Sequence, residues 1–278
     1  LDSVSVSTIS KTDKNVWFGT DNGVFILEDN EMIRMMVDKQ PFTEQILCIL
    51  RNDSSAWIGT AGGVSLLSNK GTGWELTEYY SQPNINEGSV SALLKGKGQH
   101  IWIAFLNKGL MNWDGEEFRN VELPNGIEAV TCLNVGPNGF LWIGTDGGGL
   151  LKTRLTNKIP ETKDISIVNN DQVEVSSNIH QMVFDNNGDL WIGTSFGIQR
   201  VQLSSNSDIV TVKNYNSEHG FYGTETSLNA CCKDSVGNLY FGSITGLTRY
   251  AQKNDRSNFK EPRIVITDVD LGEGNTEW

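Results

Sequence analysis

Short apolar runs separated by polar turns dominate the hydrophobic pattern of the chain. Segments 185–190 ("DNNGDL") and 234–239 ("DSVGNL") are clear turns, because Asp bonds the turn backbone and Gly adopts positive φ. An apolar run precedes each turn, and a segment with an aromatic residue and a glycine follows it. The pattern predicts β-strands joined one after another by tight turns.

One motif recurs six times, for example as "LWIGTDGGGL" at 141–150 and "LWIGTSFGI" at 190–198. Its aromatic anchors stand 40, 45, 40, 49 and 49 residues apart; they are Trp17, Trp57, Trp102, Trp142, Trp191 and Tyr240. An aliphatic residue that predicts a buried inner strand precedes each anchor; these are Val6, Ile46, Val90, Val130, Ile179 and Leu228. Repeats of this period predict an all-β fold, a β-propeller of four-stranded blades. Six repeats are recognisable, so the ring is six-bladed or is part of a seven-bladed ring.

The glycines of the motif have a structural interpretation. Taken alone, the stretch "NGFLWIGTDGGGLLKTRL" at 138–155 is similar to a phosphate-binding loop, but such a loop needs a helix after its glycines. The following "LLKTRL" has no capping residue and no helical period. A glycine two residues after the anchor recurs at 19, 59, 144, 193 and 242, which predicts close approach of neighbouring blades. Trp74 and Trp113 lie outside the anchor position and are free for another role.

The motif resembles a known repeat. The pattern D-x-x-G-x-L-W-I-G-T-x-x-G-L is similar to the two-component regulator propeller repeat, found in periplasmic sensor regions of bacterial hybrid two-component systems. Segment 214–250 resembles the terminal repeat of that family, in which Tyr-Phe-Gly replaces Trp-Ile-Gly. Segment 261–271 ("EPRIVITDVDL") resembles the first strand of the Ig-like domain that follows. The resemblance implies a propeller over 1–258 and, over 259–278, the truncated start of an Ig-like domain or a closing outer strand.

The resemblance also implies a setting and a function. Sensors of the family carry two seven-bladed propellers, an Ig-like domain, a membrane helix, a kinase and a DNA-binding regulator. The chain is therefore expected to be a piece of the second propeller, with a seventh blade upstream, in the periplasmic region of an inner-membrane protein. The implied function is the sensing of an oligosaccharide-type signal, passed through a homodimer by conformational change to a membrane-linked histidine kinase.

Composition and charge narrow the classes of partner. The 278 residues are 38% hydrophobic and carry a net charge of −12. This charge argues against nucleic acid and anionic membrane surfaces, since both need clustered Lys and Arg. No apolar run approaches the ~20 residues that cross a bilayer, and the opening "LDSVSVSTIS" lacks the features of a signal peptide. The four cysteines lie in apolar runs without CxxC spacing, so we expect them to be buried.

Residues for catalysis are sparse. The three histidines, His100, His180 and His219, share no metal-ligand spacing, and no nucleophile elbow is present. We therefore expect no catalytic residue, metal or cofactor in this segment, and we do not expect an enzyme. The alternative interpretation is a propeller enzyme that resembles the streptogramin lyases, whose metal would need His180, His219 and Glu225.

Loops on one face of a propeller gather around its channel and offer a binding site. Here they contain aromatic, amide and carboxylate side chains, which suit sugars because aromatic faces stack on C–H groups while amides and acids bond hydroxyls. The third repeat replaces Gly and Thr by Ala104 and Phe105, and we expect Phe105 to project. The predicted ligand-binding residues are Phe105, Asn107, Asp146, Phe196, His219, Phe221, Tyr222 and Glu225. The alternative is an interaction or dimerisation scaffold without a ligand of its own.

Overall fold

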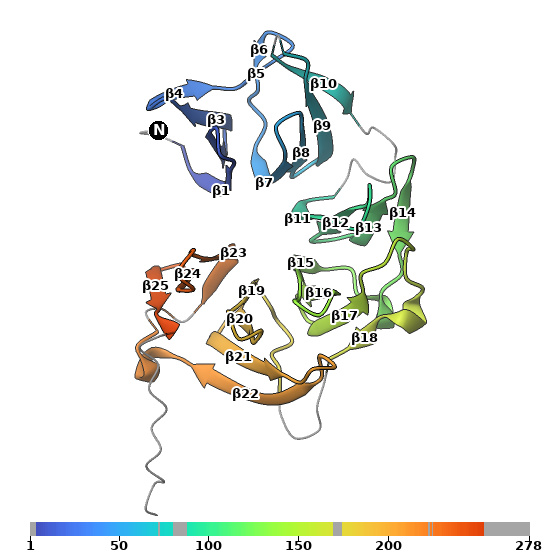
Figure 1. Ribbon diagram of the computed structural model, residues 1–278, viewed down its shortest axis with the longest axis vertical. Coiled ribbons are helices and arrows are strands. Elements are labelled where there is room, and N and C mark those ends of the chain that lie inside the picture. The colour runs from blue at the N-terminus through green and yellow to red at the C-terminus, as the bar shows by residue number, and fades with distance from the viewer. Residues whose placement is uncertain are drawn as a thin grey trace, which may run out of the picture.

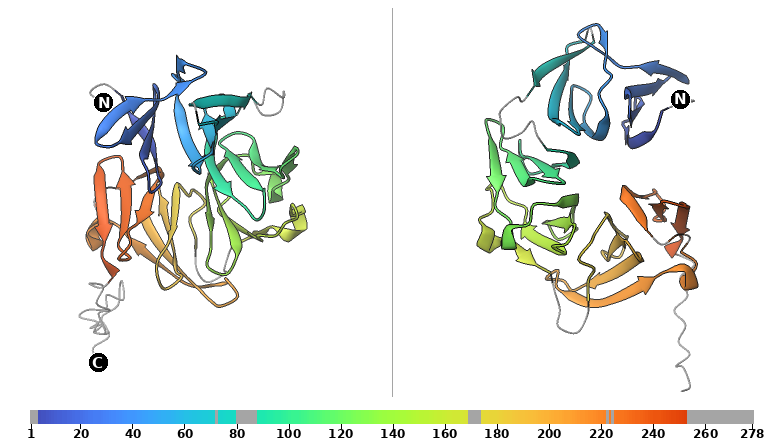
Figure 2. Two further views of the ribbon diagram at one scale, coloured as in Figure 1. Left: turned by 45° about the horizontal axis from the view of Figure 1, so that its top comes forward. Right: turned by 180° about the vertical axis from the view of Figure 1, so that it is seen from behind.

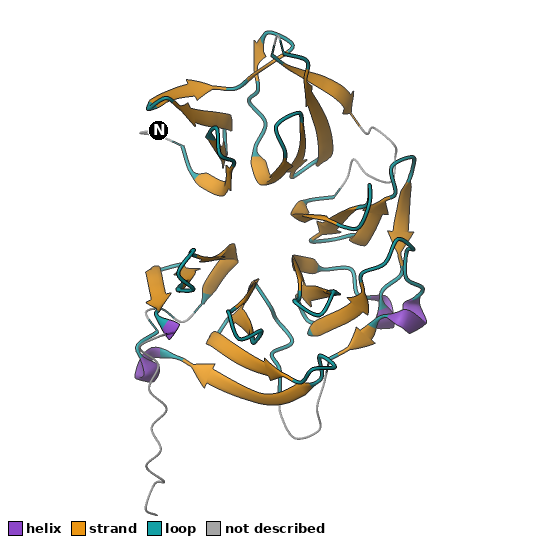
Figure 3. Ribbon diagram, viewed as in Figure 1, coloured by secondary structure: helices purple, strands orange, loops and turns teal. Residues whose placement is uncertain are grey.

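The protein is a ring of antiparallel β-sheets around a central channel, as the computed structural model shows (Figure 1). The structure describes residues 4–71, 73–79, 88–168, 174–221, 223 and 225–252. These residues form six blades, so the predicted all-β propeller of four-stranded antiparallel blades is confirmed; three strands of blade 6 lie among the described residues. Helix in this part of the chain is confined to short 3-10 turns, among them Pro124–Gly126, Thr162–Asp164 and Ser217–His219 (Figure 3). No helix among the described residues has the length and apolar character needed to cross a membrane.

The blades follow one another in chain order, and each runs from an inner strand outward. Blade 1 contains β1 (Val6–Lys11), β2 (Val16–Thr20), β3 (Gly23–Glu28) and β4 (Glu31–Arg34). Blade 2 contains β7 (Ile46–Arg51), β8 (Ser55–Thr60), β9 (Gly63–Asn69) and β10 (Trp74–Tyr79), extended by β5 (Met36–Val37) and β6 (Gln40–Pro41). Blade 3 contains β11 (Val90–Lys95), β12 (Ile101–Phe105), β13 (Gly109–Trp113) and β14 (Phe118–Val121).

The second half of the ring repeats this order. Blade 4 contains β15 (Val130–Val135), β16 (Phe140–Thr145), β17 (Leu150–Arg154) and β18 (Ser166–Ile167). Blade 5 contains β19 (Gln181–Phe184), β20 (Leu190–Thr194), β21 (Gly197–Leu203) and β22 (Ile209–Tyr215). Blade 6 contains β23 (Thr226–Lys233), β24 (Leu239–Ser243) and β25 (Gly246–Tyr250). The predicted Ig-like start or closing strand at 259–278 lies outside the described residues.

The anchor tryptophans pack between blades, as the repeat predicts. Trp17 of blade 1 meets Trp74 of blade 2 edge-on, with ring centroids 4.8 Å apart. Trp57 of blade 2 lies 6.1 Å from Trp113 of blade 3. Trp74 and Trp113 are therefore not free for another role, which corrects the expectation from sequence. Trp74 and Trp113 cover the faces of the anchors that point toward the next blade. An aromatic pair of this kind stabilises the interface beyond the effect of the buried area.

Glycine after the anchor is required because the next blade touches the backbone there. A Cβ placed on Gly59 would lie 2.7 Å from Val90 of blade 3, and one on Gly144 would lie 2.9 Å from Ile179 of blade 5. Both distances are shorter than ordinary Cβ contacts, so a side chain at either glycine would force its neighbour to shift. The predicted close approach of neighbouring blades is confirmed at these positions.

The threonine and the turn aspartate of the motif hold the turns on either side of the anchor strand. The Thr20 hydroxyl donates to the Gly23 carbonyl at 2.8 Å and closes the turn between β2 and β3. Before β20, the Asp185 carboxylate accepts the backbone N–H groups of Asn187 and Asp189 and also the indole N–H of Trp191, at 3.0 Å. The aspartate therefore forms the turn, as predicted, and also orients the anchor.

Blade 6 departs from the repeat in its inner strand. β23 pairs Thr226 with Ser243 and Cys231 with Phe241, so extra residues bulge between these two pairs. Thr226 takes the buried place predicted for Leu228, which is 47% exposed instead. Within the bulge, Asn229 has a positive φ of 52°, which Asn adopts more readily than most residues.

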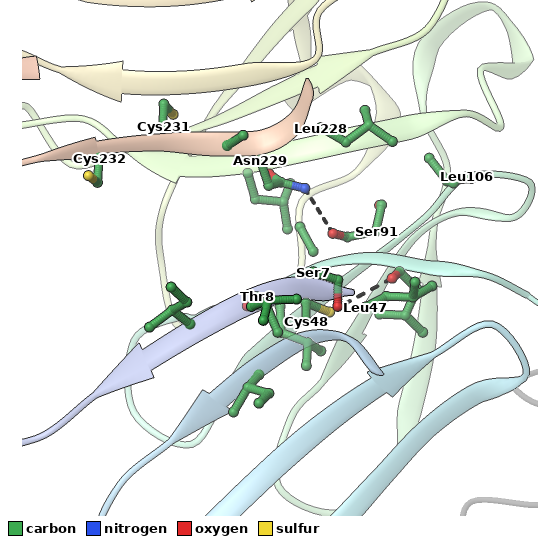
Figure 4. A pocket seen from close by; sticks show the side chains of 18 of the residues that line it. Ser7, Thr8, Leu47, Cys48, Ser91, Leu106, Leu228, Asn229, Cys231 and Cys232 are labelled. Carbon is green, nitrogen blue, oxygen red and sulfur yellow. Dashed lines mark hydrogen bonds between the residues drawn. The ribbon is translucent and has the colours of Figure 1, made fainter. Parts of the chain in front are cut away.

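The cysteines do not share one environment. Cys132 is buried, Cys48 and Cys231 are partly buried, and Cys232 is exposed. Burial raises the pKa of the Cys48 and Cys132 thiols to about 12. The prediction that all four are buried is wrong for Cys232. On β23 the Cys231 thiol lies against the Met182 carbonyl of blade 5, and Cys232 projects from the opposite side of the strand (Figure 4).

Candidate functional site

The turns between second and third strands lie on the same face of the ring as the connections that enter each inner strand. Backbone hydrogen bonds join the two sets: Gly23 N–H to the Glu44 carbonyl at 2.9 Å, Gly147 N–H to Ser177 at 3.1 Å and Ile244 N–H to Glu225 at 3.2 Å. We call this side the loop face. The repeat predicts that these loops gather around the channel. The hydrogen bonds hold each turn beside the connection that enters the next inner strand.

A cavity of about 390 Å³ opens at the channel mouth on the loop face. Three titratable side chains from three successive blades line it: Asp146 from the turn after β16, His180 just before β19, and Glu225 just before β23. The remaining lining residues are Leu106, Ala129, Thr131, Thr226, Ser227, Leu228 and Ile244. Two of the predicted site residues, Asp146 and Glu225, are thus brought together, although 79 positions separate them in the sequence.

His180 has its tautomer fixed by a backbone carbonyl. Its Nδ1 lies 2.8 Å from the carbonyl oxygen of Thr226, which can only accept, so Nδ1 carries the proton. In the neutral ring the Nε2 atom then carries the lone pair, and it lies 3.5 Å from the Ser195 hydroxyl. His180 is not among the ligand-binding residues predicted from the sequence. Its position one residue after Ile179, the first buried residue of the inner strand, is the signal that could have placed it at the mouth.

The hydroxyls beside His180 are also directed by backbone carbonyls. Thr131 donates to the carbonyl of Ile179, and Thr226 donates to the carbonyl of Thr194 at 3.1 Å. Both hydroxyls therefore turn their lone pairs away from these carbonyls. Their side chains are 2% exposed, so they form the floor of the cavity beneath the exposed carboxylates of Asp146 and Glu225.

Two predicted aromatic contacts are buried in the blades. Phe105 has no exposed surface and packs in the hydrophobic cluster of Trp57, Val90 and Ile103, so the expectation that it projects is wrong. Its ring occupies the space that a side chain at Gly88 would need. Phe221 is 4% exposed and packs in the cluster that contains Trp191 and Phe241. Apolar rings at these positions gain more from burial than from a place on the loop face.

The other predicted residues are accessible but dispersed over the loop face. Asn107 is exposed and accepts the backbone N–H of Ser89 at 3.3 Å. Phe196 is 85% exposed, next to Ser195, whose hydroxyl meets His180. His219 bonds Asn216 at 2.8 Å. Tyr222 lies outside the described residues. Ligand contact at all eight positions stays a prediction.

The metal site needed by the alternative enzyme interpretation is not assembled in the described part of the chain. His180 and Glu225 line the mouth cavity. His219 stands beside Tyr215, with ring centroids 5.9 Å apart, and is not among the lining residues. Over the described ranges, no three residues of the His, Cys, Asp and Glu types group closely enough to hold a metal ion.

The fifth repeat matches a known family. Residues 174–196 match the family model described as two-component regulator propeller, which confirms the resemblance seen in the sequence at this repeat. The matched segment contains His180, the Asp185 turn and the anchor Trp191. No curated protein matches the chain.

Several solved structures are similar in fold. The extracellular domain of a putative one-component system from B. thetaiotaomicron is 17% identical, with a TM-score of 0.67 over 88% of this chain and 32% of that one. The extracellular domain of a putative hybrid two-component system from the same organism is 19% identical, with a TM-score of 0.52 over 91% of this chain and 39% of that one. Virginiamycin B lyase from Staphylococcus aureus is 15% identical, with a TM-score of 0.63 over 89% and 81%.

These likenesses show a shared fold and not a shared function, because propellers with unrelated functions have the same fold. The chain spans between 32% and 39% of the length of the two B. thetaiotaomicron domains.

Proposed function

We propose that this propeller is a ligand-sensing unit of a two-component sensor, exposed outside the cytoplasm in the periplasm. The two-component regulator repeat at 174–196 and the likeness to extracellular domains of a putative one-component and a putative hybrid two-component system support this role. The membrane-linked histidine kinase that receives the signal, and the homodimer that transmits it, belong to the proposal for the longer protein.

The proposed ligand is an oligosaccharide-type signal at the channel mouth. The observation that carries this assignment is the arrangement of Asp146, His180 and Glu225 around one cavity of about 390 Å³. Carboxylates and an imidazole lone pair accept hydrogen bonds from sugar hydroxyls. The exposed ring of Phe196, next to the Ser195 that meets His180, provides an apolar face near the rim.

The same arrangement suggests how binding is converted into a signal. Asp146, His180 and Glu225 belong to blades 4, 5 and 6 (Figure 1). A ligand that bonds all three favours one relative position of these blades over others. In a sensor, this differential affinity for two conformations is what shifts the population.

Calorimetric titration against a panel of neutral oligosaccharides tests the proposal. We expect one of them to bind the complete sensor region, and the double variant Asp146→Asn/Glu225→Gln to bind it at least about tenfold more weakly, because hydrogen bonds to charged groups are lost. Glu31→Gln, on the exposed strand β4 at the outside of blade 1, is the control and should bind normally.

Three outcomes separate the alternatives. A flat response from the complete sensor region would overturn the oligosaccharide assignment. Normal affinity in the double variant would show that the ligand binds somewhere other than the channel mouth. A sensor that responds to its ligand when this propeller binds none would favour the scaffold function instead.

A further inference from the structure

The residue that ends an inner strand can cover the anchor tryptophan of the preceding blade. Arg51 ends β7, and its guanidinium lies over the ring of Trp17, 4.4 Å from the centroid. Phe184 ends β19, and its ring centroid lies 6.1 Å from that of Trp142. Since the loop face is where the inner strands begin, this cover lies on the opposite face of the ring.

The equivalent residue between blades 2 and 3 is Lys95, which does not cover its anchor. Lys95 ends β11 and is exposed. Within the described ranges, its ammonium group has no ion pair, hydrogen bond or ring contact. The anchor of blade 2, Trp57, is 7% exposed, whereas the other anchor tryptophans are 1–2% exposed. The position that covers the anchor in two other interfaces therefore leaves part of Trp57 accessible.

A cavity of about 280 Å³ lies where this cover is absent. Its apolar lining comes from Leu50 and Trp57 of blade 2 and from Ile101 and Trp113 of blade 3. Trp113 packs against Trp57, with ring centroids 6.1 Å apart, and is only partly buried, so it also borders the cavity. The two blades are neighbours in the ring, as Figures 1 and 2 show from opposite sides. A cavity of this size and lining suits one flat six-membered ring.

The charged residues that line the cavity are both basic. They are Arg51 and Lys95, and no carboxylate of the described residues lines it, although the chain carries a net charge of −12. Arg51 is turned toward blade 1, where it donates to the carbonyls of Ser10 and Asn15 at 3.0 and 2.9 Å. The Lys95 ammonium is thus the group that can pair with an anion at the rim.

The rim offers few other groups for hydrogen bonding. The Asn52 side chain accepts the backbone N–H and the hydroxyl of Ser55, at 2.8 and 3.2 Å, so these two side chains already bond each other. Gln99 is the other lining residue with a side-chain amide, and it is exposed. A sugar acid would bury hydroxyls here without partners, which is unfavourable. An aromatic carboxylate needs only a cation and apolar surfaces.

We propose that this cavity binds a single-ring aromatic carboxylate of the benzoate type. Its ring lies against Trp57 and Trp113, and its carboxylate pairs with the Lys95 ammonium. The ligand ring takes the place that the Phe184 side chain holds beside Trp142 between blades 4 and 5. The cavity lies on the face opposite the loop face, so the inference is independent of the ligand proposed for the channel mouth.

Fluorine NMR of 4-fluorobenzoate with the complete natural polypeptide tests the proposal. We expect the ligand signal to broaden on binding. We expect 4-fluorobenzamide, which has a similar shape without the charge, to bind at least about threefold more weakly, because the ion pair is lost. Lys95→Gln should weaken the binding of 4-fluorobenzoate by a similar factor. Lys97→Gln is the matched control and should bind normally, since Lys97 is exposed in the turn after β11 and is not among the residues that line the cavity.

Lys95→Phe supplies a second measurement, because it copies the cover that Phe184 gives to Trp142. The new phenyl ring should occupy the cavity and bury apolar surface. We therefore expect this variant to lose the binding of 4-fluorobenzoate and to have a Tm no lower than that of the parent protein. Binding that persists in Lys95→Phe would place the ligand elsewhere and overturn the proposal.

Three other results would also overturn it. One is a 4-fluorobenzoate signal that does not broaden, and another is equal affinity in Lys95→Gln and the parent protein. The third is displacement of 4-fluorobenzoate by an equal concentration of glucuronate, which would assign the cavity to a sugar acid. The oligosaccharide at the channel mouth is tested by its own titration, so either proposal can fail while the other stands.

Discussion

The side-chain amide of Asn229 donates a 3.0 Å hydrogen bond to the backbone carbonyl of Thr131, across the channel from blade 6 to blade 4. The same amide donates to the carbonyl of Ser91 in blade 3, also at 3.0 Å. One side chain on the β23 bulge therefore ties three blades together at the axis. Asn229 makes these bonds from a left-handed backbone conformation, with a φ of 52°.

Asn229 is predicted to stabilise the ring through both its amide and its backbone. Asn229→Ala should lower the free energy of unfolding by about 1–3 kcal/mol through the lost hydrogen bonds. Asn229→Gly loses the same bonds but relieves the positive φ, so it should be about 1 kcal/mol more stable than the alanine variant. Urea denaturation measures both, and equal stability of the two variants would show that the backbone conformation contributes nothing.

The Asp185 carboxylate is predicted to be needed for anchoring Trp191. Asp185→Ala removes the acceptor of the buried indole N–H and a partner of Arg200, whose guanidinium lies 3.8 Å away, and should cost about 2–4 kcal/mol. In Trp191→Phe the donor is already absent, so the same aspartate change should cost less there. Thermal denaturation of the parent protein, the two single variants and the double variant gives the coupling energy between Asp185 and Trp191. Asp53→Ala, in the surface ion pair with Lys14, should leave the Tm nearly unchanged.

Gly59→Ala should strain the interface between blades 2 and 3. The new methyl group would lie 2.4 Å from the Cys48 sulfur and 2.7 Å from Val90, and the expected cost is about 1–3 kcal/mol. Gly62→Ala is the matched control, since its nearest neighbour is 3.9 Å away and its φ is not positive. Chemical denaturation should separate the two alanines. Adding Val90→Ala to Gly59→Ala should restore part of the loss caused by the glycine change, and no restoration would argue against this contact as the cause.

The buried Cys132 thiol predicts a loss of stability at alkaline pH. Burial raises its pKa from 9.0 to about 12, so between these values the unfolded state releases a proton that the folded state keeps. The stabilisation is complete below about pH 9 and falls by about 1.4 kcal/mol per pH unit above it. Denaturation measured from pH 8 to 11 should show a shallower decline in Cys132→Ala than in the parent protein. Identical slopes would mean that this thiol titrates normally in the fold.

The sequence predicts the ring well because its signals are local and repeated. The anchor at Trp142 and the glycine at 144 each recur around the chain, and both do in the structure what the period predicts. The threonine of the motif could have been interpreted in the same way, since Thr20 and Thr194 each close a turn onto a glycine carbonyl. A hydroxyl followed three residues later by glycine is a sufficient signal for this bond.

The candidate site is predicted less well because it lies where the copies differ. Phe105 stands where most other repeats have a threonine whose hydroxyl faces the turn. The phenyl ring at this position packs inward against Trp57 and Val90 instead. The bulge in β23 displaces Leu228 and moves Thr226 into its place, and no pattern in "TSLNACC" fixes its length. The direction of a side chain on a single irregular copy depends on its neighbours in space, which the repeat does not specify.

The fixed proton on His180 has a consequence for what the channel mouth rejects. Its Nε2, the two carboxylates of Asp146 and Glu225, and the hydroxyls of Thr131 and Thr226, whose protons are committed to backbone carbonyls, present electron pairs to the same small volume. The carboxylate of a uronate, or the sulfate group of a sulfated sugar, would bring further negative charge and no proton to share. If the mouth binds a glycan as proposed, it should therefore bind neutral glycans more tightly than anionic glycans of equal length, because the anionic ones are repelled.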